Sequence, residues 1–180
     1  MKKQKKLNNN SLVATVMSNL GLKNYAKEND IKFVETKVGD RYVLEEMLKH
    51  NYNLGGEQSG HIILLDYNPT GDGILTSIML IKTLLENNMK ASELRKNINI
   101  YPQVLVNAKV KNENKYDYFE DEEIQESIKR LEQEFSGDGR VLIRTSGTEP
   151  LVRVMIEGKD IKYINKKARE LANLIESKLN

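Results

Sequence analysis

The sequence predicts two small domains of different fold class. The first, residues 1–99, is an α/β domain with a layered β-α-β sheet. The second, residues 100–180, is an α+β domain with an antiparallel sheet and two helices on one face. In the first part, short apolar runs alternate with helix-like segments, as in sheets whose strands are joined by helices. In the second part, two long amphipathic stretches need a sheet to cover, which favours an antiparallel sheet.

The first domain opens with a continuous β-rich run at residues 12–17, typical of a strand covered on both faces. A short helix follows, with residues 18–19 as capping candidates, and a second strand spans residues 31–38. Asp40 is expected to cap a helix over residues 41–50. The side chains that this helix is expected to bury are Val43, Leu44, Met47 and Leu48.

A glycine-rich break at residues 54–61 precedes a buried-looking strand at 62–65 and a turn at 66–73. Helical periodicity then predicts a helix over residues 74–87 and a shorter one over 91–98. The inner face of the longer helix is expected to contain Ile78, Ile81, Leu84 and Leu85.

The second domain contains three predicted strands and two predicted helices. The strands are residues 104–110, 140–144 and 151–157, and the helices are residues 121–135 and 160–179. Apolar residues recur three, four or seven positions apart in each helix, so each has one apolar stripe. The charged, tyrosine-bearing segment 111–120 is interpreted as a surface loop.

Composition and charge exclude several classes of protein. The formal charge is +2, from 28 basic and 26 acidic residues, which is too balanced to indicate a nucleic-acid partner. Cysteine is absent, which rules out disulfides and thiolate chemistry. No apolar run approaches the roughly 20 residues of a membrane helix, and no secretory signal is visible, so a cytoplasmic location is expected.

The heptad Arg144–Pro150 concentrates groups that bind anions. The hydroxyls and the glycine of this heptad, together with the guanidiniums of Arg144 and of Arg153 just downstream, offer many hydrogen-bond donors, and arginine matches the geometry of phosphate oxygens. The same residues also suit an ordinary turn beside a solvated Arg–Glu pair. Composition alone leaves both interpretations open.

This heptad, together with the arginine downstream, resembles the phosphate-binding loop in the last domain of the α-D-phosphohexomutase superfamily. The resemblance implies a set of phosphate-binding residues in this chain. They are Arg144, Ser146, Gly147, Thr148 and Arg153.

A second motif, Gly56–His61, is similar to the sugar-binding loop of the same superfamily, in the form found in its phosphoglucosamine mutase branch. Without that resemblance, a glycine turn and a structural histidine would be the simpler interpretation. The resemblance implies that Glu57, Ser59 and His61 bind the substrate sugar. It also places Lys37, Asp40 and Arg41 as candidate residues of the cleft near the reacting phosphate.

The resemblance begins at Leu12 and covers only the third and fourth domains of the family. The phosphorylated serine of the first domain and the Asp-x-Asp-x-Asp metal loop of the second have no counterpart in this sequence, so no catalytic residue and no metal ligand is expected in this chain. Residues 1–10 are expected to mark a cut within a longer enzyme.

The implied activity is the interconversion of glucosamine 6-phosphate and glucosamine 1-phosphate through a hexose bisphosphate, with Mg²⁺ in the full-length enzyme. The implied partners are the phosphosugar and the N-terminal domains, with a homodimer of the full-length enzyme left open. The isolated chain is expected to be inactive.

The sequence leaves three alternatives to this interpretation. The chain could be a phosphosugar-binding module without turnover, or it could come from a phosphomannomutase or phosphoglucomutase. A nucleotide-binding α/β domain is disfavoured, because the sequence has neither a Gly-x-Gly-x-x-Gly motif nor a P-loop.

Overall fold

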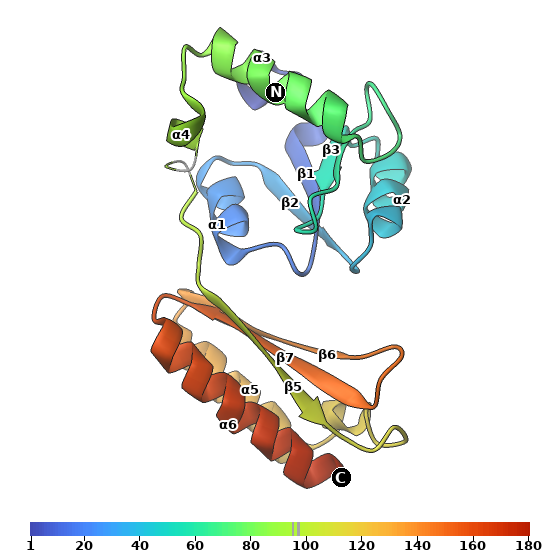
Figure 1. Cartoon of the computed structure of the whole chain (residues 1–180), viewed down its shortest axis with the longest axis vertical. Coiled ribbons are helices and arrows are strands. Elements are labelled where there is room, and N and C mark those ends of the chain that lie inside the picture. The colour runs from blue at the N-terminus through green and yellow to red at the C-terminus, as the bar shows by residue number, and fades with distance from the viewer. Residues whose placement is uncertain (95, 97) are drawn as a thin grey trace. The chain divides into compact units, whose positions relative to one another are not determined.

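The computed structural model of the chain describes residues 1–94, 96 and 98–180. It divides into two compact units, Met1–Ile100 and Tyr101–Asn180 (Figure 1). Two short 3-10 helices, Lys2–Gln4 and Asn8–Asn10, precede the first strand.

The first unit is built on a four-stranded mixed sheet of order β2-β1-β3-β4. Its strands are β1 (Ser11–Thr15), β2 (Lys32–Thr36), β3 (Leu54–Gly56) and β4 (Ile62–Leu64). Strand β1 is parallel to β2 and β3, whereas β4 is antiparallel to β3. The predicted α/β class is therefore confirmed. Strand β3 lies within the glycine-rich break, where glycine weakens the sequence signal for a strand.

Two helices, α1 (Leu20–Glu28) and α2 (Asp40–His50), lie on opposite sides of this sheet (Figure 1). Asn19 caps α1, because its side chain accepts a hydrogen bond from the Gly21 amide at 3.0 Å. The buried cluster under α2 consists of Val13, Val43, Met47, Tyr52 and Ile63.

Two expectations for α2 are wrong. The N-cap is Gly39, and no side chain caps it, because Asp40 is already the first residue of the helix and accepts from the next amide, that of Arg41. Leu48 is 60% exposed, because it lies on the side of α2 away from the sheet, whereas Val43 and Met47 are fully buried.

Helix α3 (Gly73–Glu86) is capped by Asp72, whose side chain accepts from the Leu75 amide at 2.9 Å. The predicted inner face is wrong: Ile78, Ile81 and Leu85 are 57%, 56% and 76% exposed. None of the residues of α3 is buried, since the helix meets the sheet mainly beside the edge strand β4. The predicted helix at 91–98 is observed as α4 (Ala91–Leu94), while positions 95 and 97 lie outside the described residues.

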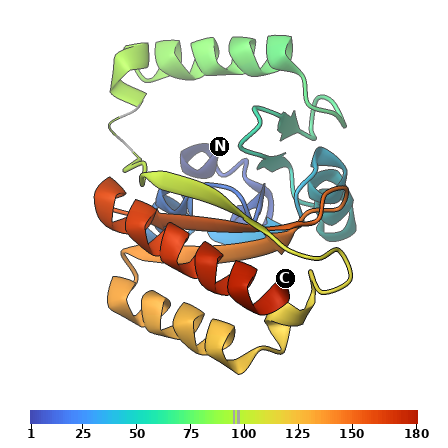
Figure 2. The same ribbon diagram turned by 60° about the horizontal axis from the view of Figure 1, so that its bottom comes forward.

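The second unit has a three-stranded antiparallel sheet of order β5-β7-β6. The strands are β5 (Gln103–Lys109), β6 (Gly139–Thr145) and β7 (Leu151–Gly158), and the helices are α5 (Glu122–Phe135) and α6 (Ile161–Leu179). Both helices cover the same face of the sheet, as predicted (Figure 2). Aspartates begin both helices: Asp121 caps α5 and Asp160 caps α6.

Alternation along the strands separates the two faces of this sheet. In β7, Val152, Val154 and Ile156 are fully buried in the core that both helices share. The helix residues in this core are Ile124, Leu131, Phe135, Ile164, Ala168, Leu171, Ala172, Ile175 and Leu179.

The interpretation of residues 111–120 as a surface loop is wrong at two positions. Lys115 and Tyr118 are 8% and 4% exposed. Burial raises the pKa of Tyr118 to about 12, and its hydroxyl donates to the Ile143 carbonyl at 3.4 Å. The segment therefore packs against the end of the sheet, because lysine and tyrosine can bury their apolar stems while their polar ends reach backbone carbonyls.

A buried ion pair across β6 and β7 should be important for the stability of this unit. The Arg140 Nε lies 2.5 Å from the Glu157 carboxylate, whose side chain has no exposed surface. Removing the guanidinium with Arg140→Ala should lower the free energy of unfolding by about 3 to 5 kcal/mol, because a buried carboxylate loses its cationic partner. Urea denaturation measures this change.

Lys159→Ala is the matched control, because Lys159 pairs with Asp138 at 2.6 Å while both side chains are more than half exposed. Its effect on the free energy of unfolding should be much smaller, because solvent screens an exposed pair. Equal effects of the two substitutions would contradict the importance of the buried pair.

Candidate functional site

The first candidate loop connects β3 to β4 as a tight hairpin. The Glu57 amide donates to the His61 carbonyl at 2.9 Å, and the Gly60 amide donates to the Glu57 carbonyl at 3.1 Å. Gly60 has a φ of +102°, a conformation that glycine adopts readily. A Cβ on Gly56 would lie 2.6 Å from the His61 carbonyl oxygen, so the close backbone approach requires glycine there.

The hairpin brings the three predicted sugar-binding side chains into mutual contact. The Ser59 hydroxyl lies 2.6 Å from the Glu57 Oε1 and 3.0 Å from the His61 Nδ1, and the two latter atoms are 3.2 Å apart. The Glu57 side chain is only 10% exposed, whereas that of His61 is 50% exposed. A nearly buried carboxylate is thus held beside a hydroxyl and an imidazole at the surface.

A backbone amide that sequence analysis missed completes this cluster. The Gly39 N–H donates to the second oxygen of Glu57 at 3.2 Å, with Gly39 at a φ of +129°. The neighbouring side chains turn elsewhere. Asp40 bonds within its own helix, and the 81%-exposed Arg41 pairs with Glu45 at 2.7 Å.

The third predicted cleft residue, Lys37, is exposed. The turn before α2 therefore contacts the sugar loop through the backbone amide of Gly39, and not through the side chains of Lys37, Asp40 or Arg41. In the sequence, the position of Gly39 just before a predicted helix was the one feature that could have indicated a role for its amide.

A cavity of about 520 Å³ adjoins the sugar loop. Most of the residues that line it are apolar, and its polar lining comes from Ser18–Asn19, Tyr25 and Glu57–Gln58. A sugar needs hydrogen-bond partners around its ring, so the loop and the polar segments suit it better than the apolar wall does.

The second candidate loop joins β6 to β7 and places two guanidiniums side by side. Arg144 and Arg153 are direct partners in the antiparallel register, so their side chains leave the same face of the sheet, opposite the helices. The pKa of Arg144 is lowered, first by burial and then by the positive charge of Arg153. Like charges in this position repel each other.

One carboxylate in the loop partly balances this charge. The Arg153 Nη2 lies 3.3 Å from the Glu149 Oε2, and the Glu149 side chain is 57% exposed. An exposed pair of this kind is weak and can rearrange when an anion arrives.

Other parts of the heptad brace the loop. Ser146 is 3% exposed; its hydroxyl accepts from the Glu149 amide at 3.2 Å, and its carbonyl accepts from the buried Lys115 Nζ at 3.2 Å. Gly147 and Thr148 are exposed. Lys115 was missed because a lysine in a charged segment gives no signal of burial.

Strand β5 adds a further residue that sequence analysis did not identify. Asn107 is the register partner of Arg153, so Asn107, Arg153 and Arg144 form a row across all three strands. Alternation in β5 predicts that Asn107 points away from the core, but only the register shows which residue it faces.

Residues 1–94, 96 and 98–180 contain neither a side-chain cluster suited to a metal ion nor a helix suited to span a membrane. In that part of the chain, no cluster of three or more His, Cys, Asp or Glu side chains is arranged to hold a metal ion. Over the same range, no helix combines the length and the apolar character needed to cross a bilayer.

Two family models match the chain in succession. The α/β/α domain III of phosphoglucomutase/phosphomannomutase matches residues 1–101, and the C-terminal domain of the same family matches residues 105–174.

Phosphoglucosamine mutases are close relatives in sequence. Those from Thermoanaerobacter sp. (strain X514) and Alkaliphilus oremlandii (strain OhILAs) are 60% and 61% identical to this chain over 180 residues. Each match covers 100% of this chain but 40% of the relative. The chain thus spans about 40% of the length of these relatives, at their C-terminal end.

Solved structures share the fold at lower identity. The N-acetylphosphoglucosamine mutase of Aspergillus fumigatus matches with a TM-score of 0.79 and 20% identity, over 96% of this chain and 39% of its own. The substrate complex of an N-acetylglucosamine-phosphate mutase matches with a TM-score of 0.74 and 19% identity, over 92% of this chain and 38% of its own. Both likenesses show the fold of the chain.

The buried contact of Lys115 makes a prediction for the second loop. Lys115→Met should leave the Ser146 carbonyl without this donor, so amide hydrogen exchange at Ser146 and Leu151 should accelerate. Hydrogen exchange read by NMR tests this, with the exposed Lys111→Met as the matched control. Unchanged exchange in Lys115→Met would show that the loop holds its shape without the lysine.

Proposed function

This chain belongs to the phosphoglucomutase/phosphomannomutase family, and we propose that it forms the sugar- and phosphate-recognising part of a phosphoglucosamine mutase. In this proposal the enzyme interconverts glucosamine 6-phosphate and glucosamine 1-phosphate through a bisphosphate. The 60% identity to named phosphoglucosamine mutases favours this branch over a phosphomannomutase or phosphoglucomutase.

The pairing of Arg144 with Arg153 is the observation that carries the phosphate role. Two like charges placed opposite each other on adjacent strands are destabilising, and the lowered pKa of Arg144 reflects both burial and this repulsion. A dianionic phosphate between the guanidiniums would convert the repulsion into two charge-assisted attractions. Phosphate binding would therefore explain why two arginines face each other here, although their repulsion lowers the stability of the fold.

Gly147 supports the same assignment. A Cβ at this position would meet no atom of the protein within 4 Å, so the fold itself has no need of glycine there. The open space lies in the same loop as the arginines, where the missing side chain leaves room for a phosphate to approach the backbone.

The proposed reaction requires a phosphate site that binds the phosphate equally well whether it is attached to C6 or to C1 of the sugar. As the bisphosphate turns over, the retained phosphate is on C6 in one half of the cycle and on C1 in the other. A rigid cluster that contacts only phosphate oxygens serves both orientations. We assign this role to Arg144, Ser146, Gly147, Thr148 and Arg153, with Ser146 contributing mainly through the shape of the loop because it is buried.

The sugar loop supplies the complementary recognition. Glu57 accepts hydrogen bonds from sugar hydroxyls, while Ser59 and His61 can both donate and accept, which suits hydroxyl groups presented in either orientation. The contacts among these three side chains hold them in position before the sugar binds. Pre-positioning lowers the entropy lost on binding.

Phosphoryl transfer belongs to other parts of the enzyme in this proposal. The sequence contains neither a Ser-His-Asn loop nor an Asp-x-Asp-x-Asp run, so this chain binds and orients the substrate. A phosphosugar-binding module without turnover is the second candidate, because both loops would serve it equally well. Activity of the longer protein separates the two candidates.

Substitution of either arginine should weaken phosphosugar binding. Arg144→Ala or Arg153→Ala should reduce the affinity for glucosamine 6-phosphate by about 1.5 to 3 kcal/mol, the usual value of a charge-assisted hydrogen bond. Arg→Lys should restore little of it, since an ammonium group lacks the planar fork. Titration calorimetry with paired melting curves measures both quantities.

Glu57→Ala is the control for this experiment: it should damage sugar recognition and leave the binding of inorganic phosphate at the arginine loop intact. If the arginine variants lower the melting temperature and keep their affinity, the guanidiniums brace the sheet. Loss of phosphate binding in Glu57→Ala would contradict the division between the two loops.

Glycine substitutions separate phosphate recognition from folding. Gly147→Ala should leave the melting temperature almost unchanged while weakening the binding of inorganic phosphate, because its Cβ would occupy the space proposed for the ligand. Gly139→Ala should do the opposite, since its Cβ would lie 2.6 Å from Phe135 ring atoms and from the Glu157 carbonyl oxygen. Full phosphate affinity in Gly147→Ala would count against the proposed position of the phosphate.

The isolated chain should not catalyse the conversion of glucosamine 6-phosphate. Incubation of the 180-residue chain with glucosamine 6-phosphate, Mg²⁺ and glucose 1,6-bisphosphate should yield no glucosamine 1-phosphate, because the chain carries recognition groups only. Measurable product in a coupled assay would show that this chain contains catalytic groups of its own.

A further inference from the structure

Helix α3 carries a stripe of large apolar side chains that nothing in the described structure covers. The stripe consists of Ile74, Ile78, Ile81 and Leu85, which are 78%, 57%, 56% and 76% exposed. Their spacing of three and four residues places them on one side of the helix. Single exposed apolar residues are ordinary, but a contiguous stripe on one helix marks an interaction surface.

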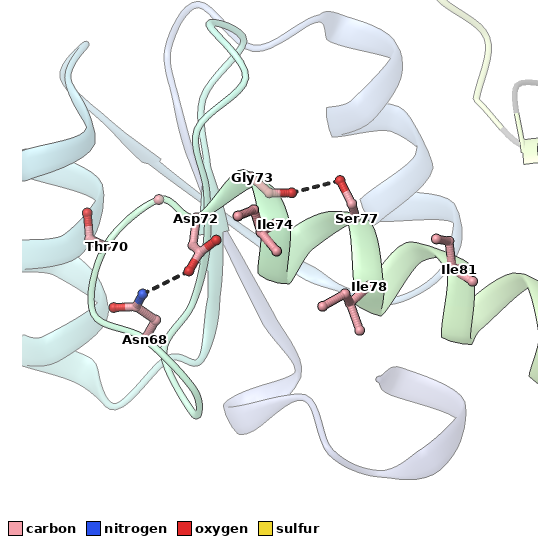
Figure 3. A pocket seen from close by; sticks show the side chains of 9 residues that line it. Asn68, Thr70, Asp72, Gly73, Ile74, Ser77, Ile78 and Ile81 are labelled. Atoms are coloured by element: carbon pink, nitrogen blue, oxygen red, sulfur yellow. Dashed lines mark hydrogen bonds between the residues drawn. The ribbon is translucent and has the colours of Figure 1, made fainter.

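The helix itself is well formed around this stripe. Asp72 caps it, and the Thr76 hydroxyl donates to the Asp72 carbonyl. The Ser77 hydroxyl donates to the Gly73 carbonyl at 2.7 Å (Figure 3). Three residues of the stripe, Ile74, Ile78 and Ile81, also line an open cavity of about 690 Å³, whose other wall is the polar segment Asn68–Asp72. The apolar side chains are therefore presented by an ordered element.

The N-terminal residues of the chain lie beside this stripe. The Gln4 side chain donates to the Glu86 carboxylate at 3.2 Å. Met1–Gln4 also line a common cavity with Met79, Lys82 and Thr83 of α3. These helix residues occupy the side of α3 adjacent to the stripe, since Lys82 follows Ile78 by four positions.

The longer relatives supply a candidate for the cover of the stripe. This chain matches their C-terminal 40% over its whole length, so in them the preceding polypeptide reaches this domain at the position of Met1, next to α3. We propose that the stripe docks the amino-terminal part of the same enzyme, through an apolar segment that runs along α3 just before it reaches position 1. The inference rests on the proposed function only in taking its partner from the same mutase.

A covalently connected partner suits a stripe of this size. A tethered segment binds at high effective concentration, so four side chains can hold it. A second copy of the chain would need a free-standing interface of roughly 1,200 Å² or more, which a stripe on one 14-residue helix does not supply.

Thiol labelling tests the proposal directly, because the chain has no cysteine. Ile78→Cys places a single thiol on the stripe. Leu80→Cys is the matched control, two residues away and about 200° around the helix axis. Each substitution is made in the 180-residue chain and in a chimera that joins this chain to the preceding part of the Thermoanaerobacter relative. Alkylation by iodoacetamide is followed by mass spectrometry of the α3 peptide.

In the chimera, Ile78→Cys should react at least about tenfold more slowly than in the chain alone, because alkylation then requires local opening. Leu80→Cys should change by less than about twofold, since its surroundings stay the same. Equal rates for Ile78→Cys in the two proteins would overturn the proposal. Protection that appears in the chain alone and rises with its concentration would also overturn it, in favour of a second copy.

The same pair of substitutions in the natural relative, at the positions aligned with Ile78 and Leu80, keeps the test decisive if the chimera fails to fold. This readout needs no substrate. Failure of phosphosugar binding with stripe protection intact would contradict the proposed function alone, and the reverse result would contradict the docking alone.

Discussion

The register between β6 and β7 is the constraint on which the second unit depends. It places Arg140 opposite the buried Glu157 at one end of the strand pair and Arg144 opposite Arg153 at the other. The alternate residues of β7 fill the core beneath the helices. A slip of one residue would move every one of these side chains to the wrong face. The attractive pair and the core therefore hold the strands in the register that keeps the two guanidiniums together.

The first unit positions its loop by a different device. Strand β3 has only three residues, two of them glycines, and gains little from its own side chains. It is fixed by neighbours on both sides, β1 and β4, and by the approach of Met47 and Val43 to Gly55, where a Cβ would lie 2.4 Å from the Met47 sulfur. The hairpin that follows can then hold Glu57 against the Gly39 amide. Packing of α2 on the sheet and the shape of the sugar loop are thus coupled.

Sequence periodicity predicted most elements of the fold because each strand and helix has a local pattern of its own. What it could not supply were contacts between segments far apart in the chain. The Gly39 amide, the buried Lys115 and the row from Asn107 to Arg144 all depend on register or on loop packing. The two motifs directed attention to two loops whose binding roles stay predictions, and composition could not show that Asp40 and Arg41 turn back to their own helix.

The error at α3 has a different origin from these omissions. Its apolar periodicity is as regular as that of α6, yet the α6 stripe from Ile164 to Ile175 is buried and the α3 stripe is exposed. An apolar stripe of this kind predicts that one face of the helix is covered, but it does not indicate which part of the protein covers that face. In α6 the cover lies within the same unit, whereas for α3 the 180 residues contain no such layer among those described. The exposed face of α3, which the sequence predicts to be buried, is therefore the observation on which the docking proposal rests.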